Sequence, residues 1–325
     1  MSRSACASLL LAPAVLLLFG LSLMAGKVWV PFDAWFSDQA GWWIIFELRL
    51  PRAILATAIG AMLGLSGAVL QGYLRNPLAD PGLIGVSSGA ALGAVASIFF
   101  GLAASPFALF ACAMAGAGAT MLLLGLLVGR SESAIAFILA GTVLSSLAGS
   151  ATAFLISIAP NPFATSEIVI WLMGALTDRG IDEARLALPC IAAGMLLLLT
   201  TGRSIDALSL GEAAARSLGV RLGRLQAVIV LGLGLGVGAA VAVTGVVGFV
   251  GLIVPHIVRP FVGQKPSALL LPSALGGAAL LLAADSLVRL APGAAEVRLG
   301  VAMALIGGPF FFVLLFRMRR SMAWS

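Results

Sequence analysis

The sequence predicts an all-α membrane protein, a single polytopic domain over residues 1–325 with ten transmembrane helices and both termini in the cytoplasm. The composition is the first observation behind this prediction. Hydrophobic residues make up 61% of the chain and charged residues only 10%, whereas soluble proteins hold about 25% charged residues. A soluble fold could not cover so much apolar surface, so lipid must be the solvent for most of the chain.

Apolar runs are the second observation, because a helix needs about 20 apolar residues to cross a bilayer. Ten candidate runs fall at residues 8–25, 53–74, 83–102, 107–128, 134–159, 186–201, 225–245, 246–262, 268–288 and 299–316. The first run is too long for the apolar part of a signal peptide, so it is interpreted as a span. The uncharged residues 225–258 are few for two full spans, so a short or broken helix is expected at GVVGFVGLIVPH.

Charge distribution is the third observation. With both termini inside, twelve of the 19 Lys and Arg residues fall on the cytoplasmic side, together with four of the 13 acidic residues. This bias agrees with the positive-inside rule, and an inverted topology would break it. Glycines four residues apart also predict close helix packing within the membrane. These pairs are Gly60/Gly64, Gly89/Gly93, Gly232/Gly236 and Gly234/Gly238.

Several kinds of site are not indicated by the sequence. There is no Gly-rich nucleotide-binding motif, so the chain is not expected to hydrolyse ATP by itself. Cys6, Cys112 and Cys190 show no metal-ligand spacing, and no dense basic patch suggests nucleic acid. The single histidine, His256, is interpreted as structural. No catalytic residue, metal or cofactor is therefore predicted, and a membrane enzyme is disfavoured.

The longest polar segment, about residues 203–224, is predicted to form a short charged helix at the cytoplasmic face. Ser209 is the expected N-cap, with Glu212 three residues later as its capping-box partner. Gly219 is the expected stop signal. The residues alone leave open whether this helix meets a partner or is a solvated loop helix.

Two other polar features interrupt the apolar runs. In RNPLADP, Pro77 and Pro81 break the helix, and Asn76 and Asp80 can bond the freed backbone groups. Asp285 lies inside an apolar run with Arg289 one turn later, so the two could form a structural ion pair or a functional site. Arg49 and Arg52, at the outer edge of the second span, could simply be interfacial anchors.

Five ordered segments resemble one known family. They are RLPRAILATAIGAMLGLSGAVLQGYLRNPLADPGLIGVSSGAALGA, ALSLGEAAARSLGV, GFVGLIVPHIVR, LLLAADSLVRL and ALIGGPFFFVLL. Together they resemble the FecCD-type permease subunits of ABC importers for iron-siderophores, haem and cobalamin. The resemblance covers essentially the whole chain. One departure is Arg298, because the family usually reads AELPxG where this chain reads AEVRLG.

The resemblance implies a ten-helix subunit of the bacterial inner membrane that works as a homodimer with two ATPase subunits and a periplasmic binding protein. It implies ATPase coupling by Leu210, Gly211, Glu212, Ala215, Arg216, Leu218 and Gly219. It further implies binding-protein docking by Arg49, Arg52 and Arg289, and an inner gate at Asn76, Pro77 and Leu78.

The function expected from this resemblance is import of a metal chelate from the binding protein into the cytoplasm. A ferric siderophore is favoured as the substrate, with haem and cobalamin as the other options. The alternative from another class is an ion-driven secondary transporter of a small solute. Such a transporter usually carries carboxylates near the membrane midplane, and Asp285 alone lies well inside a predicted span.

Overall fold

The computed structural model describes residues 3–129, 133–292 and 296–322, and in these ranges the regular elements are helices. The helices are α1 (Arg3–Met24), α2 (Ala34–Ser37), α3 (Gln39–Trp42), α4 (Leu50–Tyr73), α5 (Val86–Phe99), α6 (Pro106–Val128), α7 (Ala134–Ser157), α8 (Pro162–Leu172), α9 (Ile181–Leu199), α10 (Gly202–Leu208), α11 (Glu212–Ser217), α12 (Leu222–Thr244), α13 (Val250–Val262), α14 (Pro266–Leu290) and α15 (Leu299–Met322). A π-helical segment, Trp43–Arg49, leads into α4, and a 3-10 turn, Pro81–Ile84, precedes α5. The all-α prediction is therefore confirmed.

Within the described ranges, seven helices are long and apolar enough to cross a membrane, or eight if α9 and α10 form one span bent by 42°. Each of the ten predicted spans overlaps a helix, but α5 and α13 are shorter than a full span. The count of ten therefore stays a prediction. Helix α8 is a third short apolar helix; it lies in the stretch 160–185, where short helices are expected but their boundaries could not be predicted.

Proline explains several helix starts. Four prolines occupy the first turn of a helix, where the backbone N–H that proline lacks would have no intrahelical partner: Pro51, Pro106, Pro162 and Pro266. The helix predicted to be short or broken near residues 245–256 is confirmed. Gly245 (φ 71°) and Phe249 (φ 69°) adopt left-handed backbone conformations, so α13 begins only at Val250.

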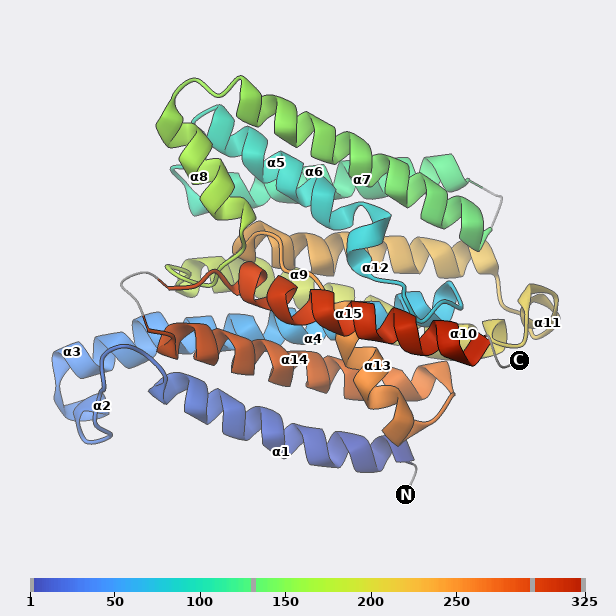
Figure 1. Ribbon diagram of the computed structural model, residues 1–325, viewed down its shortest axis with the longest axis horizontal. Coiled ribbons are helices and arrows are strands. Elements are labelled where there is room, and N and C mark those ends of the chain that lie inside the picture. The colour runs from blue at the N-terminus through green and yellow to red at the C-terminus, as the bar shows by residue number, and fades with distance from the viewer. Residues whose placement is uncertain (1–2, 130–132, 293–295, 323–325) are drawn as a thin grey trace.

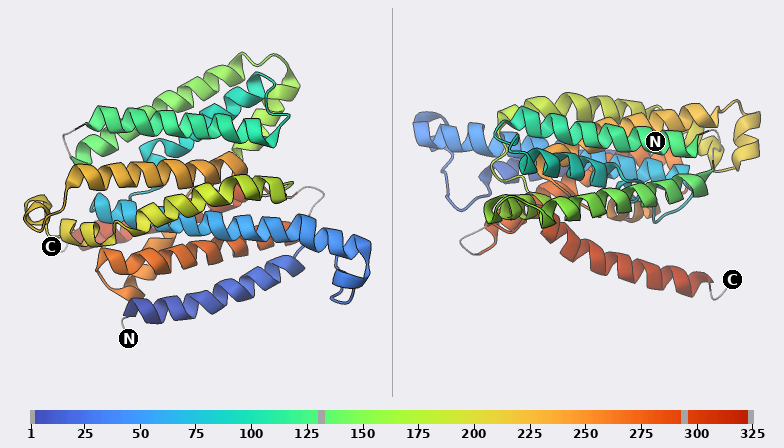
Figure 2. Two further views of the ribbon diagram at one scale, coloured as in Figure 1. Left: turned by 180° about the vertical axis from the view of Figure 1, so that it is seen from behind. Right: turned by 90° about the horizontal axis from the view of Figure 1, so that it is seen from above.

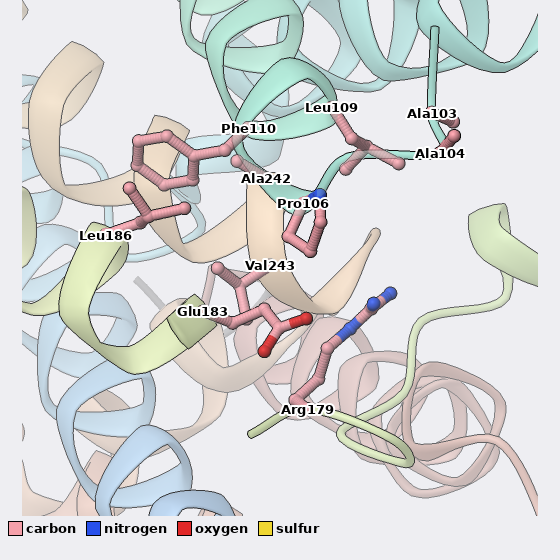
Figure 3. A pocket seen from close by; sticks show the side chains of 10 residues that line it. All are labelled: Ala103, Ala104, Pro106, Leu109, Phe110, Arg179, Glu183, Leu186, Ala242 and Val243. Atoms are coloured by element: carbon pink, nitrogen blue, oxygen red, sulfur yellow. The ribbon is translucent and has the colours of Figure 1, made fainter. Parts of the chain in front are cut away.

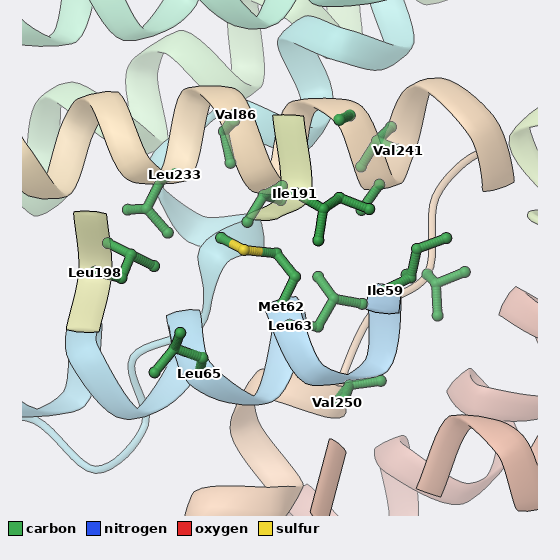
Figure 4. Packing of buried hydrophobic residues seen from close by; sticks show 14 of the residues in the cluster. Ile59, Met62, Leu63, Leu65, Val86, Ile191, Leu198, Leu233, Val241 and Val250 are labelled. Carbon is green, nitrogen blue, oxygen red and sulfur yellow. The ribbon is translucent and has the colours of Figure 1, made fainter. Parts of the chain in front are cut away.

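Helix α4 lies at the centre of the bundle and is buried along most of its length. Figure 4 shows Met62 of α4 among apolar side chains of neighbouring helices, including Ile191 of α9 and Leu233 of α12. Glycines let the backbones touch on its other side. A Cβ atom at Gly60 would overlap the Gly277 carbonyl of α14, and one at Gly67 would overlap Gly251 of α13.

The glycine spacings noted in the sequence do mark close contacts. Gly89 and Gly93 of α5 pack against α6, and Gly232 and Gly236 of α12 meet Leu198 and Met62. The second α12 pair, Gly234 and Gly238, faces Met121 and Ala117 of α6. Each of these positions leaves little room for a side chain, so the small-residue prediction is confirmed.

Both ends of the described chain lie at one end of the bundle. In Figure 1, α1 begins and α15 ends at the same end as α11, whereas α2 and α3 lie at the opposite end. The right view of Figure 2 shows the C-terminal half of α15 standing apart from the other helices. This arrangement agrees with the predicted topology, in which the termini and the polar segment share one side; that this side is cytoplasmic remains a prediction.

Candidate coupling site

The polar segment between α9 and α12 folds into two short helices at the end of the bundle. Helix α10 ends at Leu208, and α11 occupies only Glu212–Ser217. Gly211 (φ 103°) and Gly219 (φ 85°) flank α11 in conformations that L side chains rarely adopt, so both glycines are needed for the turns. The predicted stop at Gly219 is confirmed.

The predicted capping box at Ser209 is wrong. The Ser209 hydroxyl donates to the Asp206 carbonyl at 2.6 Å, and the residue at the N-cap of α11 is Gly211. The reason is that α10 continues to Leu208, so Ser209 serves as its C-cap and is not free to start another helix. The pattern Ser-x-x-Glu alone cannot show that the serine already serves as the C-cap of an earlier helix.

Helix α11 presents both an anchor and an exposed apolar surface. Ala215 is fully buried and holds the helix against the bundle. Leu210 and Leu218, on either side of α11, are 69% and 64% exposed. Exposed leucines on a charged segment beyond the spans are unfavourable in water, so this surface is a candidate contact for another protein.

The elbow after α4 is tied directly to α11. Arg75 Nη2 lies 3.6 Å from Glu212 Oε1, and both side chains are partly exposed. Arg75 has φ 50°, the left-handed conformation that ends α4 and directs the chain into RNPLADP. The structure therefore joins two segments that lie far apart in the sequence and were predicted separately.

The elbow itself is built as the sequence predicts. The Asn76 Oδ1 atom accepts a hydrogen bond from the Leu78 N–H at 2.9 Å, and the Asp80 Oδ1 atom accepts one from the Gly82 N–H at 2.8 Å. Pro77 lies between these two turns and has no N–H to leave unsatisfied. Leu78 packs against the small apolar cluster formed by Leu252, Ile253 and Leu314, which belong to α13 and α15.

Behind the elbow, polar contacts continue into the bundle. The Gln71 side-chain amide of α4 donates to the Gly251 carbonyl at 3.3 Å, and Arg259 Nη2 of α13 donates to Gln71 Oε1 at 2.8 Å. At the end of α4, the Tyr73 hydroxyl donates to Gln226 Oε1 of α12 at 3.3 Å. The sequence reasoning missed these contacts, although polar residues inside apolar runs, such as Gln71 and Gln226, were a usable signal.

Helix α10 is fastened to α14 as well. Asp206 accepts a hydrogen bond from the Ser267 backbone N–H at 2.8 Å and lies 3.3 Å from Lys265 Nζ. It thus caps the N-terminus of α14, where a negative charge is favourable. The segment that carries α11 is therefore bonded to both α4, through Arg75, and α14, through Asp206.

The three arginines predicted to form an exposed docking ring lie at the opposite end and are buried. Arg49, Arg52 and Arg289 are only 7%, 8% and 3% exposed. Arg49 donates to the carbonyls of Leu23, Met24 and Val28. The ring of free positive charge is therefore not found, because nearby carbonyls and carboxylates occupy these guanidinium groups.

Asp285 organises the rest of this cluster. Its fully buried carboxylate lies 2.9 Å from Arg52 Nη2 and 3.1 Å from Arg289 Nε. Arg289 also donates to the Ala25 carbonyl at 3.0 Å and to the Ser22 hydroxyl. The predicted Asp285–Arg289 pair is confirmed, and the cluster joins α1, α4 and α14. The sequence did not reveal Arg52 as the second partner.

Glu296 closes the cluster from the loop before α15. It lies 3.0 Å from Arg52 Nη2 and accepts a hydrogen bond from the Thr177 hydroxyl at 3.0 Å. Burial alone would raise the pKa of the Glu296 carboxyl, but Arg52 and Thr177 outweigh burial, so its pKa lies below the usual value. Glu296 is therefore held as a carboxylate.

A cavity of about 130 Å³ lies at this same end, between the α5–α6 turn, the start of α9 and the end of α12. Figure 3 shows Arg179 and Glu183 reaching into it below Pro106, with Phe110 and Leu186 on its apolar side. Burial lowers the pKa of the Arg179 guanidinium, opposed by the nearby Glu183 and Asp178 carboxylates. Such a volume holds a few water molecules or one very small solute, and it is too small for a metal chelate.

His256, which the sequence predicts to be structural, lies in an apolar environment. His256 packs edge-on against the Phe310 ring, with centroids 5.8 Å apart, beside an apolar groove between α13 and α15. In the described ranges, no three His, Cys, Asp or Glu side chains are grouped so as to hold a metal ion. At the α11 end, the observed feature is the ion pair that joins α11 to the elbow.

Comparison with protein families matches residues 14–317 to the FecCD transport family. The match spans all of the helices from α2 to α14, the second half of α1 and most of α15.

The chain belongs to the FecCD transport family.

Curated relatives of this FecCD permease match it over most of their length. It is 38% identical over 321 residues to the vitamin B12 import system permease protein BtuC of Shigella boydii, covering 97% of this chain and 95% of the relative. It is 39% identical over 284 residues to the uncharacterized ABC transporter permease protein YvrB of Bacillus subtilis, covering 86% of this chain and 80% of the relative.

A solved structure also resembles the FecCD permease over nearly its whole length. It is described as an inward-facing conformation of a transporter assigned to the metal-chelate ABC type. The TM-score is 0.86 at 33% identity, covering 96% of this chain and 99% of the other. The predicted family is therefore confirmed, and the FecCD chain is a transport permease, not a catalytic subunit. The ion-driven alternative is not retained.

Proposed function

We propose that this FecCD permease is the membrane subunit of an ATP-driven importer that moves a metal chelate from a periplasmic binding protein into the cytoplasm. It works as a homodimer with two ATPase subunits in the bacterial inner membrane. The relatives support the class, since they include permeases named for vitamin B12 import and a transporter of the metal-chelate type.

The single observation that carries the mechanism is the bonded path from α11 to the elbow. An ATPase that binds the exposed Leu210 and Leu218 would move α11. Glu212 would pass that movement to Arg75, and the elbow would shift Leu78 against α13 and α15. Asn76, Pro77 and Leu78 thus act as the inner gate in this proposal, and Gly211 and Gly219 act as the flexible ends of α11.

Ala215 and Arg216 complete the proposed coupling segment. Ala215 is the fully buried contact that keeps α11 seated on the bundle, and Arg216 lies in its last turn. A single exposed ion pair such as Arg75–Glu212 contributes about 0.2–1 kcal/mol, so it directs movement and does not lock the gate.

The homodimer is proposed for reasons of size. The cavity at the outer end has about 130 Å³, far too small for a chelate approaching a nanometre across. Meanwhile α7 and α15 expose large apolar side chains along much of their length, including Leu139, Phe154, Leu305 and Phe312. A pathway between two copies would use such faces.

The substrate class is a metal chelate, and vitamin B12 is the chelate that the names of the relatives favour. Ferric siderophores and haem remain the other members of this proposed class. We further propose that the binding protein meets groups other than Arg49, Arg52 and Arg289, because these arginines already bond within the chain.

Changing both Leu210 and Leu218 to Glu should weaken assembly with the ATPase subunit at least about tenfold, because two apolar contacts would become charged. Co-purification and native mass measurement of the complex check this result. The wild-type complex should contain two permease chains and two ATPase subunits.

Two controls accompany this experiment. The variant Leu210→Met with Leu218→Met keeps the apolar surface and should assemble normally. Leu102→Glu changes an exposed leucine in the α5–α6 turn, away from α11, and should have no effect on assembly. Normal assembly of the double Glu variant, or a complex with one permease chain, would refute the proposed arrangement.

A further inference from the structure

A groove of about 560 Å³ opens along the side of the bundle between α9 and α12, close to α11. We call it the α9–α12 groove. The left view of Figure 2 shows these two helices side by side on one face of the molecule, with α11 beyond their ends. Thr200, Thr201 and Ser204 line the groove at the 42° bend between α9 and α10.

The polar end of the groove is basic. Arg221 and Arg224, three residues apart at the start of α12, line it together with Thr200 and Ser204. No acidic residue lines the groove, and in the part of the chain that the structure describes, neither arginine forms an ion pair. Both guanidinium groups are therefore available to an anion from outside the chain.

The other end of the groove is apolar and points along the membrane spans. Leu197 lies one turn before Thr200 on α9, and Val228 lies one turn after Arg224 on α12. The step from Arg221 to Val228 is roughly 10 Å along the helix axis, at 1.5 Å per residue. Beyond it, Leu231 of α12 is well exposed and continues an apolar surface away from the arginines.

A basic end followed by an apolar end along a membrane helix matches the structure of an anionic phospholipid. A phospholipid carries an anionic phosphate at one end and acyl chains at the other, and the distance between them suits the groove. Basic pockets between membrane helices on the cytoplasmic side are suited to anionic headgroups. A soluble anion would use the arginines and hydroxyls but would leave the apolar part of the groove unfilled.

We propose that the α9–α12 groove binds one anionic phospholipid, with its phosphate on Arg221 and Arg224 and an acyl chain along Leu197 and Val228. The lipid fills the space at the bend between α9 and α10, and it supports the segment that carries α11. Leu218 and Gly219 of the proposed coupling segment also line the groove, so the lipid would lie beside the proposed ATPase contact.

Native mass spectrometry of the full-length chain tests the proposal, using phosphatidylglycerol and phosphatidylcholine with identical acyl chains. The wild-type chain should retain one phosphatidylglycerol in preference to phosphatidylcholine. One arginine near an anionic lipid contributes about 1 kcal/mol, which corresponds to about a fivefold change in the affinity for that lipid. The variant Arg221→Gln with Arg224→Gln should therefore lose about thirtyfold of that preference.

Three comparisons make the result specific. Arg203→Gln removes an exposed charge from α10 that does not line the groove, so it should leave the preference unchanged. The double Lys variant keeps both charges and should retain most of the preference. Glycerol 3-phosphate, a headgroup without acyl chains, should not displace the lipid, whereas it would displace a bound ion.

The proposal is overturned if the double Gln variant retains the wild-type preference, or if Arg203→Gln loses as much of it. It is also overturned if glycerol 3-phosphate competes fully, which would indicate a site for a soluble anion. Cross-links from the groove to the ATPase subunit, with no lipid preference, would show that the groove is a protein contact.

Discussion

Replacing Asp285 by Ala is expected to lower the free energy of unfolding by about 3–5 kcal/mol, the largest stability effect expected here for a single substitution. The carboxylate is fully buried and pairs with both Arg52 and Arg289. Its removal leaves two buried guanidinium groups close together with Glu296 as the nearest remaining counter-charge. Thermal and denaturant unfolding of the purified chain in mild detergent would measure the loss.

The matched control for Asp285 is Asp182, which forms an exposed pair with Arg185 at 3.4 Å near the start of α9. Asp182→Ala should change stability by less than about 0.5 kcal/mol, since an exposed pair is solvated and contributes little. Equal stability of the two variants would show that the cluster does not hold α1, α4 and α14 together.

Replacing Gly67 by Ala is the second large expected effect, a loss of about 1–3 kcal/mol from overpacking. A Cβ atom at Gly67 would overlap the Gly251 carbonyl and force α4 away from α13. The same carbonyl accepts the hydrogen bond from Gln71, so the contact behind the elbow would also be strained. Unfolding measurements in the same detergent would quantify the change.

Gly118 of α6 provides a control of opposite sign. No atom lies within 4 Å of a Cβ at this position, so the methyl group meets open space. Gly118→Ala should be neutral or stabilising by up to about 1 kcal/mol, because alanine favours the helix. Destabilisation at Gly118 equal to that at Gly67 would mean that helix contact is not the cause.

Composition and local patterns were sufficient to locate the long helices and the elbow after α4. The apolar runs located the long helices because each span needs a continuous stretch of that length. The elbow was predictable because Pro77, Asn76 and Asp80 act through hydrogen bonds and steric effects within a few residues. The break before α13 was predictable for the same reason, from glycine and proline spacing.

Contacts between distant segments could not be read from the sequence. Arg52 and Asp285 are separated by 233 positions, and only the packing of α4 on α14 brings them together. The expected exposure of Arg49, Arg52 and Arg289 was wrong for this reason, since an arginine at the edge of a span is equally compatible with an exposed anchor and a buried partner. Ser209 failed because its neighbour α10 extended further than its local pattern indicated.

The central claim of this account is that the chain imports a metal chelate only when an ATPase bound at α11 hydrolyses ATP. Proteoliposomes containing the permease, its ATPase and the binding protein would be loaded with vitamin B12, a ferric siderophore or haem on the binding-protein side. The account predicts that one of these chelates accumulates, that accumulation requires ATP, and that ionophores have no effect. Accumulation without the ATPase, abolished by ionophores, would contradict it.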